Sequence, residues 1–321
     1  MFVSESVTNY VNFMSTTRSR WVAYYPVWVE ALDKKEGDIG YLVCESELNG
    51  VIAAASYCDD GDVLVVGVTD PSGIVVADEA EPADVYAAAL QLATKMEEIA
   101  VQRSRSAILI KSSAVCAGGV RGLVIPVSLA FDEAGYSQVS RSFYVIEGVE
   151  RTAVLAGVSS RVRSQISSAS RIFLGRCVES EKDVAAVVQM YAAHSGQRGS
   201  RCPFTVDSLT HLSAPGIDLA SARLYCPEED TSRMLGFSIS VHDTISAEVF
   251  TWGSLDRAAT AAHLTKFIIA DTIQHLAGQG YGVIEYGCRL DGPEHAGLTE
   301  FYRCMGGRTV PGVWMHKEIA S

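Results

Sequence analysis

The chain has 321 residues and a formal net charge of −12, with 26 Lys and Arg against 38 Asp and Glu. Its 48% hydrophobic content suits a globular protein with a sizeable core, long enough for two ordinary domains. Apolar runs such as 63–68 and 122–131 are too short or too interrupted to cross a bilayer, so we expect no membrane partner. The N-terminal residues lack the basic-then-apolar order of a secretion signal, which predicts a cytoplasmic protein.

The eight cysteines stand singly, at 44, 58, 116, 177, 202, 226, 288 and 304, without any Cys-x-x-Cys pair. This spacing argues against a zinc ribbon or a disulfide framework and predicts free thiols in a reducing compartment. The seven histidines show no His-Glu-x-x-His spacing, so no metal site is predicted.

The first half of the chain is predicted to mix helices and strands. Residues 1–32 are rich in aromatic residues and are predicted to be helical, with the aromatics in the core. A Leu48-Asn49-Gly50 turn is typical of a hairpin. The other predicted elements are strands at 41–45, 51–57, 63–68, 107–111 and 144–149, an acidic loop at 70–82, and an amphipathic helix at 83–102.

The second half repeats this order. The predicted elements are helices at 159–173 and 181–195, strands at 222–226, 234–242, 247–252 and 283–287, a long helix, and a short helix ending at Gly306-Gly307. A tight turn is expected at Gly253-Ser254, and Ser254 or Asp256 is expected to cap the long helix, which stops at Gly278 and Gly280. A strand that enters a helix through such a turn leaves free N–H groups for an anion or an oxyanion.

One internal repeat is specific. Gly135-Tyr136, followed by Val139, matches Gly306-Gly307, followed by Val310, at an offset of 171 residues. The helix–strand pairs before them have a similar offset. We therefore predict two copies of one α+β unit, in domains 1–157 and 158–321, with a single mixed domain as the alternative.

Positive charge is concentrated near the predicted join. Five arginines and no acid occur between 151 and 177, at positions 151, 161, 163, 171 and 176. A basic face on an acidic protein suits a phosphate-bearing ligand, and scattered solvated arginines are the alternative.

The order strand, strand, glycine turn, long helix, strand, short helix, strand resembles the GNAT acyltransferase fold. A doubled unit resembles the Fem-type (FemABX) aminoacyl-tRNA-dependent transferases of that superfamily. Three stretches carry this resemblance. They are the basic segment 161–173, similar to the family's R-x-x-I/V-x-x-A-x-K/R; the helix 263–281 with its A-x-x-x-G end; and 286–289 with 297–307, similar to G-L-x-x-F-K-x-x-F-G.

The resemblance implies an α+β fold with tandem GNAT-like domains, each a mixed, mainly antiparallel sheet flanked by helices. It implies an N-terminal domain on the acceptor side and a C-terminal domain with the donor and transfer site. The chain departs from the family pattern where Tyr302, followed by Arg303, replaces the signature lysine. It also lacks the R/Q-x-x-G-x-G/A turn that cradles the pyrophosphate of acetyl-CoA, because 252–259 holds one glycine and an aspartate.

Site roles follow from the resemblance. The catalytic candidates are Tyr302, Arg303 and His263; the candidates for binding substrate and tRNA are Phe301, Trp252, Gly253, Arg161, Arg163, Arg171 and Arg289. Phe301 would stack on the terminal adenine, Trp252 would bound the acyl pocket, and N–H groups near Gly253 would face the oxyanion. Arg303, with Tyr302, would act at the leaving ribose oxygen, and Arg161, Arg163 and Arg171 would hold phosphates. The proton acceptor is open among His263, Asp291, Glu300 and the ribose. Core packing for Phe301, solvation for Arg303 and a structural role for His263 are the alternatives.

We therefore expect a transferase that joins an amino acid from aminoacyl-tRNA to the free amine of a small peptide, a peptidyl natural product or a cell-wall precursor; a nucleotide-linked acceptor is also expected as a possible partner. The family includes tailoring enzymes of peptidyl-nucleoside antibiotic pathways. Aminoacyl-tRNA would be the co-substrate, with no further cofactor. The alternatives are an acyl-CoA-dependent N-acyltransferase and a non-catalytic GNAT-like binding module.

Overall fold

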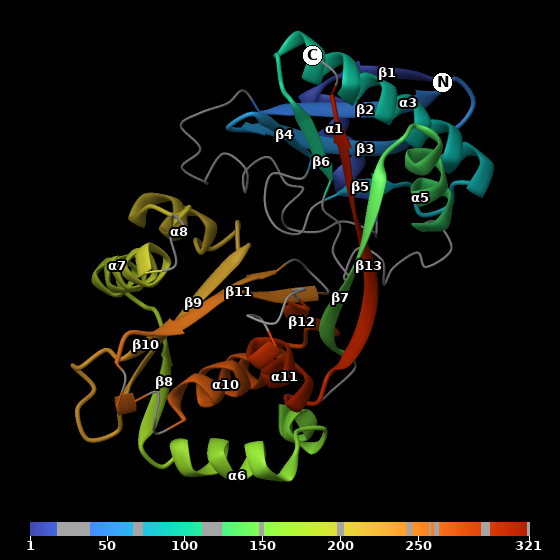
Figure 1. The fold of residues 1–321 in the computed structure, drawn as a ribbon. Coiled ribbons are helices and arrows are strands. Elements are labelled where there is room, and N and C mark those ends of the chain that lie inside the picture. The colour runs from blue at the N-terminus through green and yellow to red at the C-terminus, as the bar shows by residue number, and fades with distance from the viewer. Residues whose placement is uncertain are drawn as a thin grey trace. The chain divides into compact units, whose positions relative to one another are not determined.

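A computed structural model describes residues 1–17, 39–66, 73–110, 124–147, 151–197, 202–242, 246–256, 258–259, 263–289 and 296–319. These residues form two compact units (Figure 1). Unit 1 contains the described residues up to Ser142 and those from Pro311 onward, and unit 2 contains those from Phe143 to Val310. The predicted division at 157/158 differs from these units because two long strands each pass from one unit to the other.

Unit 1 is built on a mixed sheet in the order β1-β2-β3-β4-β6-β13, with β5 paired to β3. The strands are β1 (Phe2–Glu5), β2 (Gly40–Ser46), β3 (Gly50–Asp60), β4 (Val63–Val66), β5 (Ile74–Val76), β6 (Ala107–Ile110) and β13 (Arg308–Glu318). The pairing of β4 with β6 is parallel, and the other described registers in this unit are antiparallel. Gly50 has a φ of +67°, which suits the predicted hairpin turn between β2 and β3.

The core cluster of unit 1 lies between this sheet and the helices α3 (Pro82–Gln102) and α5 (Val124–Glu133). Helix α1 (Val7–Thr16) packs Tyr10 against Tyr41 of β2, with ring centroids 4.8 Å apart. Helix α3 begins at a proline in its first turn, where no backbone N–H is needed. Its small and aliphatic residues, such as Ala88, Leu92 and Met96, are fully buried. They pack against β2, β3 and β6 as the amphipathic pattern predicted.

Unit 2 has the strand order β7-β12-β11-β10-β9-β8. The strands are β7 (Ser137–Glu147), β8 (Phe173–Cys177), β9 (Ala220–Pro227), β10 (Gly236–His242), β11 (Ser246–Ser254) and β12 (Val283–Arg289). The helices are η2 (Arg151–Ala156), α6 (Ser160–Ala169), α7 (Glu181–Gln197), α8 (Val206–Leu212), α10 (Leu264–Gly278) and α11 (Ala296–Cys304). β11 is parallel to β12 and antiparallel to β10.

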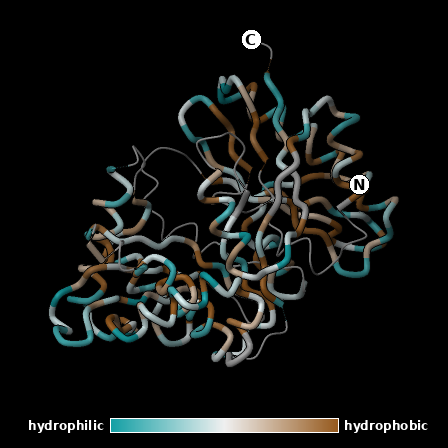
Figure 2. Tube along the Cα trace, turned by 60° about the horizontal axis from the view of Figure 1, so that its bottom comes forward, coloured by the Kyte–Doolittle hydropathy of each residue, from teal (hydrophilic) through white to brown (hydrophobic). Residues whose placement is uncertain are grey.

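Helices cover both faces of the unit 2 sheet. A Cβ on Gly236 would lie 2.6 Å from Ile268 of α10, whereas a Cβ on Gly253 would lie 2.8 Å from His194 of α7. Gly253 is opposite Phe237, the next residue after Gly236, so these contacts lie on opposite faces of the pleat. Helix α6 packs against α10 and lies below it in Figure 1. In Figure 2, hydrophilic residues gather at turns.

The internal repeat is confirmed at the predicted offset. β7 begins at 137 and β13 at 308, and they end at 147 and 318, so both differences are 171. Gly135 and Gly306, which follow the short helices α5 and α11, have φ angles of +83° and +88°. Two copies of one α+β repeat, one ending in β7 and the other in β13, therefore make up the described fold.

Several expectations were wrong in detail. The N-terminus begins with strand β1 before α1, and residues 18–32 of the predicted aromatic helix lie outside the described residues. Gly253 and Ser254 continue β11 instead of forming a turn, and the long helix starts at Leu264. β5, β8, α5 and α8 were not predicted, because such short elements carry few periods of any hydrophobic pattern.

Candidate functional site

The described register between the parallel strands β11 and β12 joins only Ser246–Glu248 to Val283–Glu285. β11 runs on to Ser254 and β12 to Arg289. On its other side, β11 remains paired with β10 as far as Ser254. The β12-facing edge of β11 beyond Glu248 therefore presents backbone groups outside this ladder, where an extended ligand could bind.

Two aromatic side chains that the sequence predicted for the site lie together beside this edge. The rings of Trp252 and Phe301 are 5.7 Å apart at a tilt of 43°. Trp252 is opposite Ser238, whose hydroxyl bonds Thr272 of α10, so Trp252 projects on the α10 face. Both rings are half-buried against the unit 2 core and keep part of their surface exposed.

The ring of Tyr302 lies in the core. Tyr302 is 9% exposed and its ring centroid is 5.6 Å from that of Tyr144. A Cβ at Gly287 of β12 would lie 2.5 Å from this ring, so the glycine leaves the space that the tyrosine fills. The Tyr286 hydroxyl accepts from the Gly307 N–H at 2.9 Å and donates to the Tyr302 carbonyl at 3.2 Å. These contacts fix α11 against β12, and the role of Tyr302 at a leaving group stays a prediction.

Arg303 is exposed and forms a two-point ion pair with Glu300 one turn earlier, with its Nε and Nη2 each 2.7 Å from a carboxylate oxygen. This hydrogen bonding lowers the pKa of Glu300 to about 2. A carboxylate with so low a pKa is a weak base at neutral pH, so Glu300 is a poor proton acceptor. The guanidinium of Arg303 remains accessible to a second anion.

The segment after β11 holds an anion supplied by the chain itself. The Asp256 carboxylate accepts from the Ala259 N–H at 2.9 Å and pairs with Arg233 Nη2 at 2.8 Å. The backbone N–H of Ala259 is the main reason why the pKa of Asp256 is lowered. Ser254 accepts from the Asp256 N–H at 3.3 Å. A carboxylate thus occupies backbone donors between β11 and α10.

His263 immediately precedes α10. It has a φ of +69°, and its side chain makes no capping hydrogen bond. This left-handed conformation turns the chain into the helix. Its role as proton acceptor stays a prediction, and Asp291 lies outside the described residues.

The arginine run divides into paired and unpaired side chains. Arg163 Nη2 donates to the carbonyls of Ala156 and Val158, both at 2.9 Å. Arg176 is paired with Asp183 at 2.6 Å. Arg161 and Arg171 are exposed, and among the described residues no carboxylate pairs with them. α6 buries Val162, Ile166 and Ala169, which leaves its polar face outward. Arg289 ends β12, and its side chain lies outside the described part.

His194 was not predicted for the site. Its ring lies on α7 behind Gly253 and packs edge-on to Phe237, with centroids 6.0 Å apart. It is far from Gly253 in the sequence, so no local pattern could have indicated this contact. In the described ranges, no group of three or more His, Cys, Asp or Glu could hold a metal ion.

No family model matches the chain, and no curated protein matches its sequence. Solved structures do match its fold. FemX superposes with a TM-score of 0.63 at 12% identity, over 98% of this chain and 97% of that chain. A tandem GNAT protein from the clavulanic acid biosynthesis pathway, solved without AcCoA, gives 0.54 at 10% identity, over 99% and 98%. L-PGS from Bacillus licheniformis gives 0.54 at 11% identity, over 88% and 85%.

The chain therefore has a tandem GNAT fold of the Fem type, as predicted. The matches cover nearly all of this chain and of FemX, so both repeats take part in the likeness. In the described part of the chain, no helix is both long enough and apolar enough to cross a membrane.

Proposed function

We propose that the protein is an aminoacyl-tRNA-dependent transferase that forms an amide bond on the free amine of a peptide, a peptidyl natural product or a nucleotide-linked precursor. The fold is shared with FemX over almost the whole chain, which supports an acyltransferase. The donor is the finer question, because the GNAT scaffold also serves acyl-CoA enzymes.

The observation that carries the proposal is the Asp256 carboxylate after β11. At the N-terminus of a helix that binds a pyrophosphate, free backbone N–H groups and the positive end of the helix dipole face the ligand. Here Asp256 accepts from one such N–H and adds negative charge. A pantetheine pyrophosphate would meet repulsion at this position, whereas the 3′ end of a tRNA needs no pyrophosphate cradle.

The transfer step needs orientation more than a strong base. The acceptor amine attacks the ester carbon, a C–N bond forms, and the C–O bond to the ribose breaks. The amine proton passes to the leaving ribose oxygen, directly or through His263. In this scheme the β12-facing edge of β11 beyond Glu248 orients the aminoacyl group, and Trp252 and Phe301 stack on the terminal adenine. Arg303 stabilises the charge that develops at the ribose or its phosphate.

Arg161 and Arg171 are the phosphate contacts that the structure supports best. Both are exposed at or beside α6 and keep their charge unpaired among the described residues. Arg163 keeps its charge too, although two backbone carbonyls fix its direction. We propose that this basic face holds the acceptor stem of the tRNA, in a protein whose net charge of −12 repels nucleic acid elsewhere.

The test is transfer from a total aminoacyl-tRNA pool, labelled on the amino acid, to small amines. The product should appear only when the pool is intact before mixing and should vanish after ribonuclease treatment. Phe301→Ala and Trp252→Ala should each lower kcat/KM about 5-fold or more, since a base–aromatic stack contributes roughly 1–3 kcal/mol. Wild-type rates in both variants would remove these residues from the site.

Salt dependence tests the basic face. The measurement is the association constant K for tRNA at several salt concentrations. Arg161→Ala and Arg171→Ala should each reduce the slope of log K against the logarithm of the salt concentration by about 0.7–0.9, because one phosphate contact is lost. Lys95→Ala is the matched control, since Lys95 is a surface cation of unit 1 that pairs with Glu98. A slope that both arginine variants leave unchanged would contradict the assignment.

An acyl-CoA-dependent N-acyltransferase is the second candidate, favoured by the match to a tandem GNAT protein whose name mentions AcCoA. Acetyl-CoA should raise the Tm of the wild-type protein if this candidate is correct. Under the aminoacyl-tRNA proposal it should not, and Asp256→Ser should at most create weak acetyl-CoA binding. A Tm rise in the wild type that exceeds the one in Asp256→Ser would favour acyl-CoA.

A further inference from the structure

Cys177 is the last residue of β8 and belongs to a polar cluster that the proposed function does not use. The cluster also contains Arg223 of β9, and Asp271 and His275 of α10. Cys177 is opposite Arg223 in the antiparallel ladder of β8 and β9, so both side chains lie on one face of the sheet, the face that α10 covers. β8 ends the described strand order of unit 2, and the Cys177 side chain is exposed.

The Arg223 guanidinium is held in a fixed direction. Its Nε and Nη2 donate to Asp271 Oδ2 at 3.1 and 2.7 Å, and Arg223 is only 8% exposed. A Cβ on Gly175 of β8 would collide with Asp271 Oδ2 and would lie 3.0 Å from Arg223 Nη2, so the glycine leaves the space that this ion pair fills. The remaining nitrogen, Nη1, donates to Cys177 Sγ at 3.3 Å.

The imidazole of His275 reaches the same sulfur, with 3.8 Å between Nε2 and Sγ. His275 follows Asp271 by one turn of α10, so one helix positions both the partner of the guanidinium and the imidazole. A guanidinium N–H stabilises negative charge on a sulfur, and a neutral imidazole can accept the thiol proton. Exposed cysteines beside such basic side chains are the ones that react with disulfides.

Cys304 on α11 has the opposite environment. Its half-buried thiol donates to Glu300 Oε1 at 3.2 Å. This hydrogen bond is the main reason why the pKa of Cys304 is raised, because the carboxylate favours the protonated sulfur. The chain thus offers one thiol beside a guanidinium and one beside a carboxylate for comparison.

We propose that Cys177 is a site of reversible S-thiolation by a small disulfide that carries carboxylate groups. The Cys177 sulfur attacks one sulfur of this disulfide, a new S–S bond forms on Cys177, and the bond between the two halves of the disulfide breaks. The thiol proton passes to His275 and from there to the departing sulfur, so Cys177 is oxidised and the disulfide releases one thiol. Arg223 stabilises the negative charge that the sulfurs share during the exchange and attracts the carboxylates of the reagent. This proposal does not rest on the proposed function.

The test compares the two thiols in the same folded protein. The full chain is incubated with oxidised glutathione at pH 7.5, free thiols are blocked with N-ethylmaleimide, and peptide mass spectrometry gives the rate at each cysteine. We expect Cys177 to be thiolated about tenfold faster than Cys304, which is the factor that a hydrogen bond to a charged group supplies. Dithiothreitol should reverse the modification. In concentrated urea the difference between the two rates should disappear, since the tertiary contacts are lost.

Two variants and a second reagent assign the cause. His275→Gln should slow the thiolation of Cys177 about fivefold or more, whereas His211→Gln, which changes an exposed histidine of α8, should leave the rate unchanged. Arg223→Lys keeps a positive charge beside Asp271 but removes the forked guanidinium, so it should slow the reaction about tenfold. Cystamine carries ammonium groups in place of carboxylates. The ratio of the glutathione rate to the cystamine rate should therefore be higher at Cys177 than at Cys304.

Equal rates at the two cysteines in the folded protein, or a faster rate at Cys304, would overturn the proposal. A rate difference that persists in urea would do the same, as would a rate at Cys177 that neither His275→Gln nor Arg223→Lys changes. If circular dichroism shows that Arg223→Lys is unfolded, His275→Gln decides by itself. A reagent ratio that is the same at both cysteines would contradict the preference for carboxylate-bearing disulfides, and with it the proposal.

Discussion

Gly253 of β11 and the His194 ring of α7 lie in contact on one face of the unit 2 sheet, and this pair gives a quantitative test of the site. A Cβ built on Gly253 would lie 2.8, 2.9 and 3.0 Å from Nδ1, Cε1 and Cγ of the imidazole. These distances are shorter than normal contacts, so Gly253→Ala must displace the ring or the strand. Overpacking of this kind costs about 1–3 kcal/mol of the free energy of unfolding.

The sign of the effect should reverse when the ring is removed. A His194→Ala background removes the three atoms nearest to the new methyl group, and alanine in a strand is favoured over glycine by about 0.5–1 kcal/mol. The two substitutions should therefore couple by about 1.5–4 kcal/mol, the sum of the two effects. The measurement is the urea midpoint by circular dichroism at pH 8 for both single variants, the double variant and the wild type.

Gly297→Ala is the control, because a Cβ there meets nothing within 4 Å on helix α11. It should stabilise the protein by about 0.5–1 kcal/mol with or without His194. If Gly253→Ala changed stability equally in both backgrounds, the close approach of Gly253 to His194 would be refuted. The position of the β11 edge in the proposed site would then need revision.

Three further predictions concern the same fold. The Thr272 hydroxyl is fully buried and lies 2.8 Å from the Tyr225 hydroxyl, so Thr272→Val should lower the free energy of unfolding by about 1–3 kcal/mol. The double variant with Tyr225→Phe should lose less than the sum of the two single losses, as measured by thermal unfolding. Hydrogen bonds from Arg176 lower the pKa of Asp183, so the ionised carboxylate stabilises the folded state above its unfolded pKa, and this stabilisation is lost as the pH falls. Asp183→Asn should therefore lower the free energy of unfolding by about 1 kcal/mol at pH 7. If the difference in this free energy between the variant and the wild type grew below pH 4 in urea unfolding, the prediction would be wrong. Iodoacetamide at pH 7.5 should label the exposed Cys177 before the buried Cys44. Burial raises the pKa of Cys44 to about 11, so this thiol should react only after unfolding. The reverse order of labelling in mass spectrometry would contradict the prediction.

Part of the candidate site was accessible from the sequence. Trp252 and Phe301 were named from the resemblance, and the structure brings their rings to 5.7 Å. The single-glycine turn with Asp256 predicted a poor pyrophosphate site, and the carboxylate does take a backbone N–H there. Tyr302 was placed on the correct helix, but a nine-residue amphipathic helix does not reveal which of its aromatic residues points inward.

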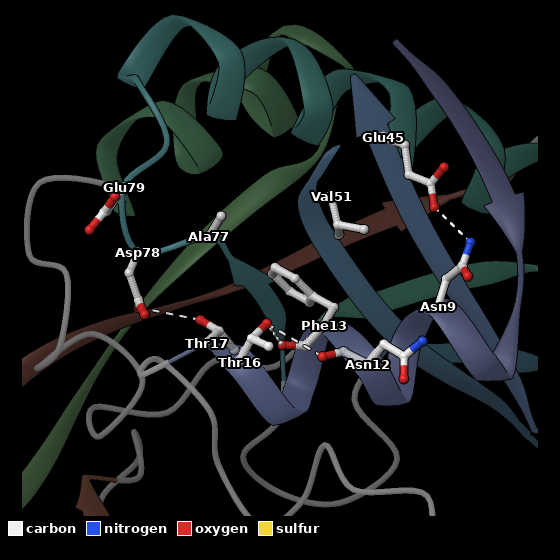
Figure 3. Close-up of a pocket in the computed structure, with 10 residues that line it drawn as sticks. All are labelled: Asn9, Asn12, Phe13, Thr16, Thr17, Glu45, Val51, Ala77, Asp78 and Glu79. Atoms are coloured by element: carbon white, nitrogen blue, oxygen red, sulfur yellow. Dashed lines mark hydrogen bonds between the residues drawn. The ribbon is translucent and has the colours of Figure 1, made fainter. Parts of the chain in front are cut away.

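Contacts between residues far apart in the chain could not be predicted from any short stretch of sequence. His194 of α7 reaches Gly253 of β11, and described residues from Asn9 to Glu79, distant in the chain, line one pocket of unit 1 (Figure 3). The predicted domains, 1–157 and 158–321, stay a prediction. A strand's hydrophobic pattern gives its faces but not its neighbours, so nothing local shows that β13 pairs with β6 in unit 1.

The sequence by itself determined the α+β class, the order of the long elements and the repeat at an offset of 171, because periodicity and glycine positions are local properties of the backbone. Only the tertiary structure decided which arginines pair with a carboxylate in the described part of the chain, and which aromatic ring is buried. Those outcomes depend on strand pairing and helix packing between residues far apart in the chain, and no short stretch of sequence records them.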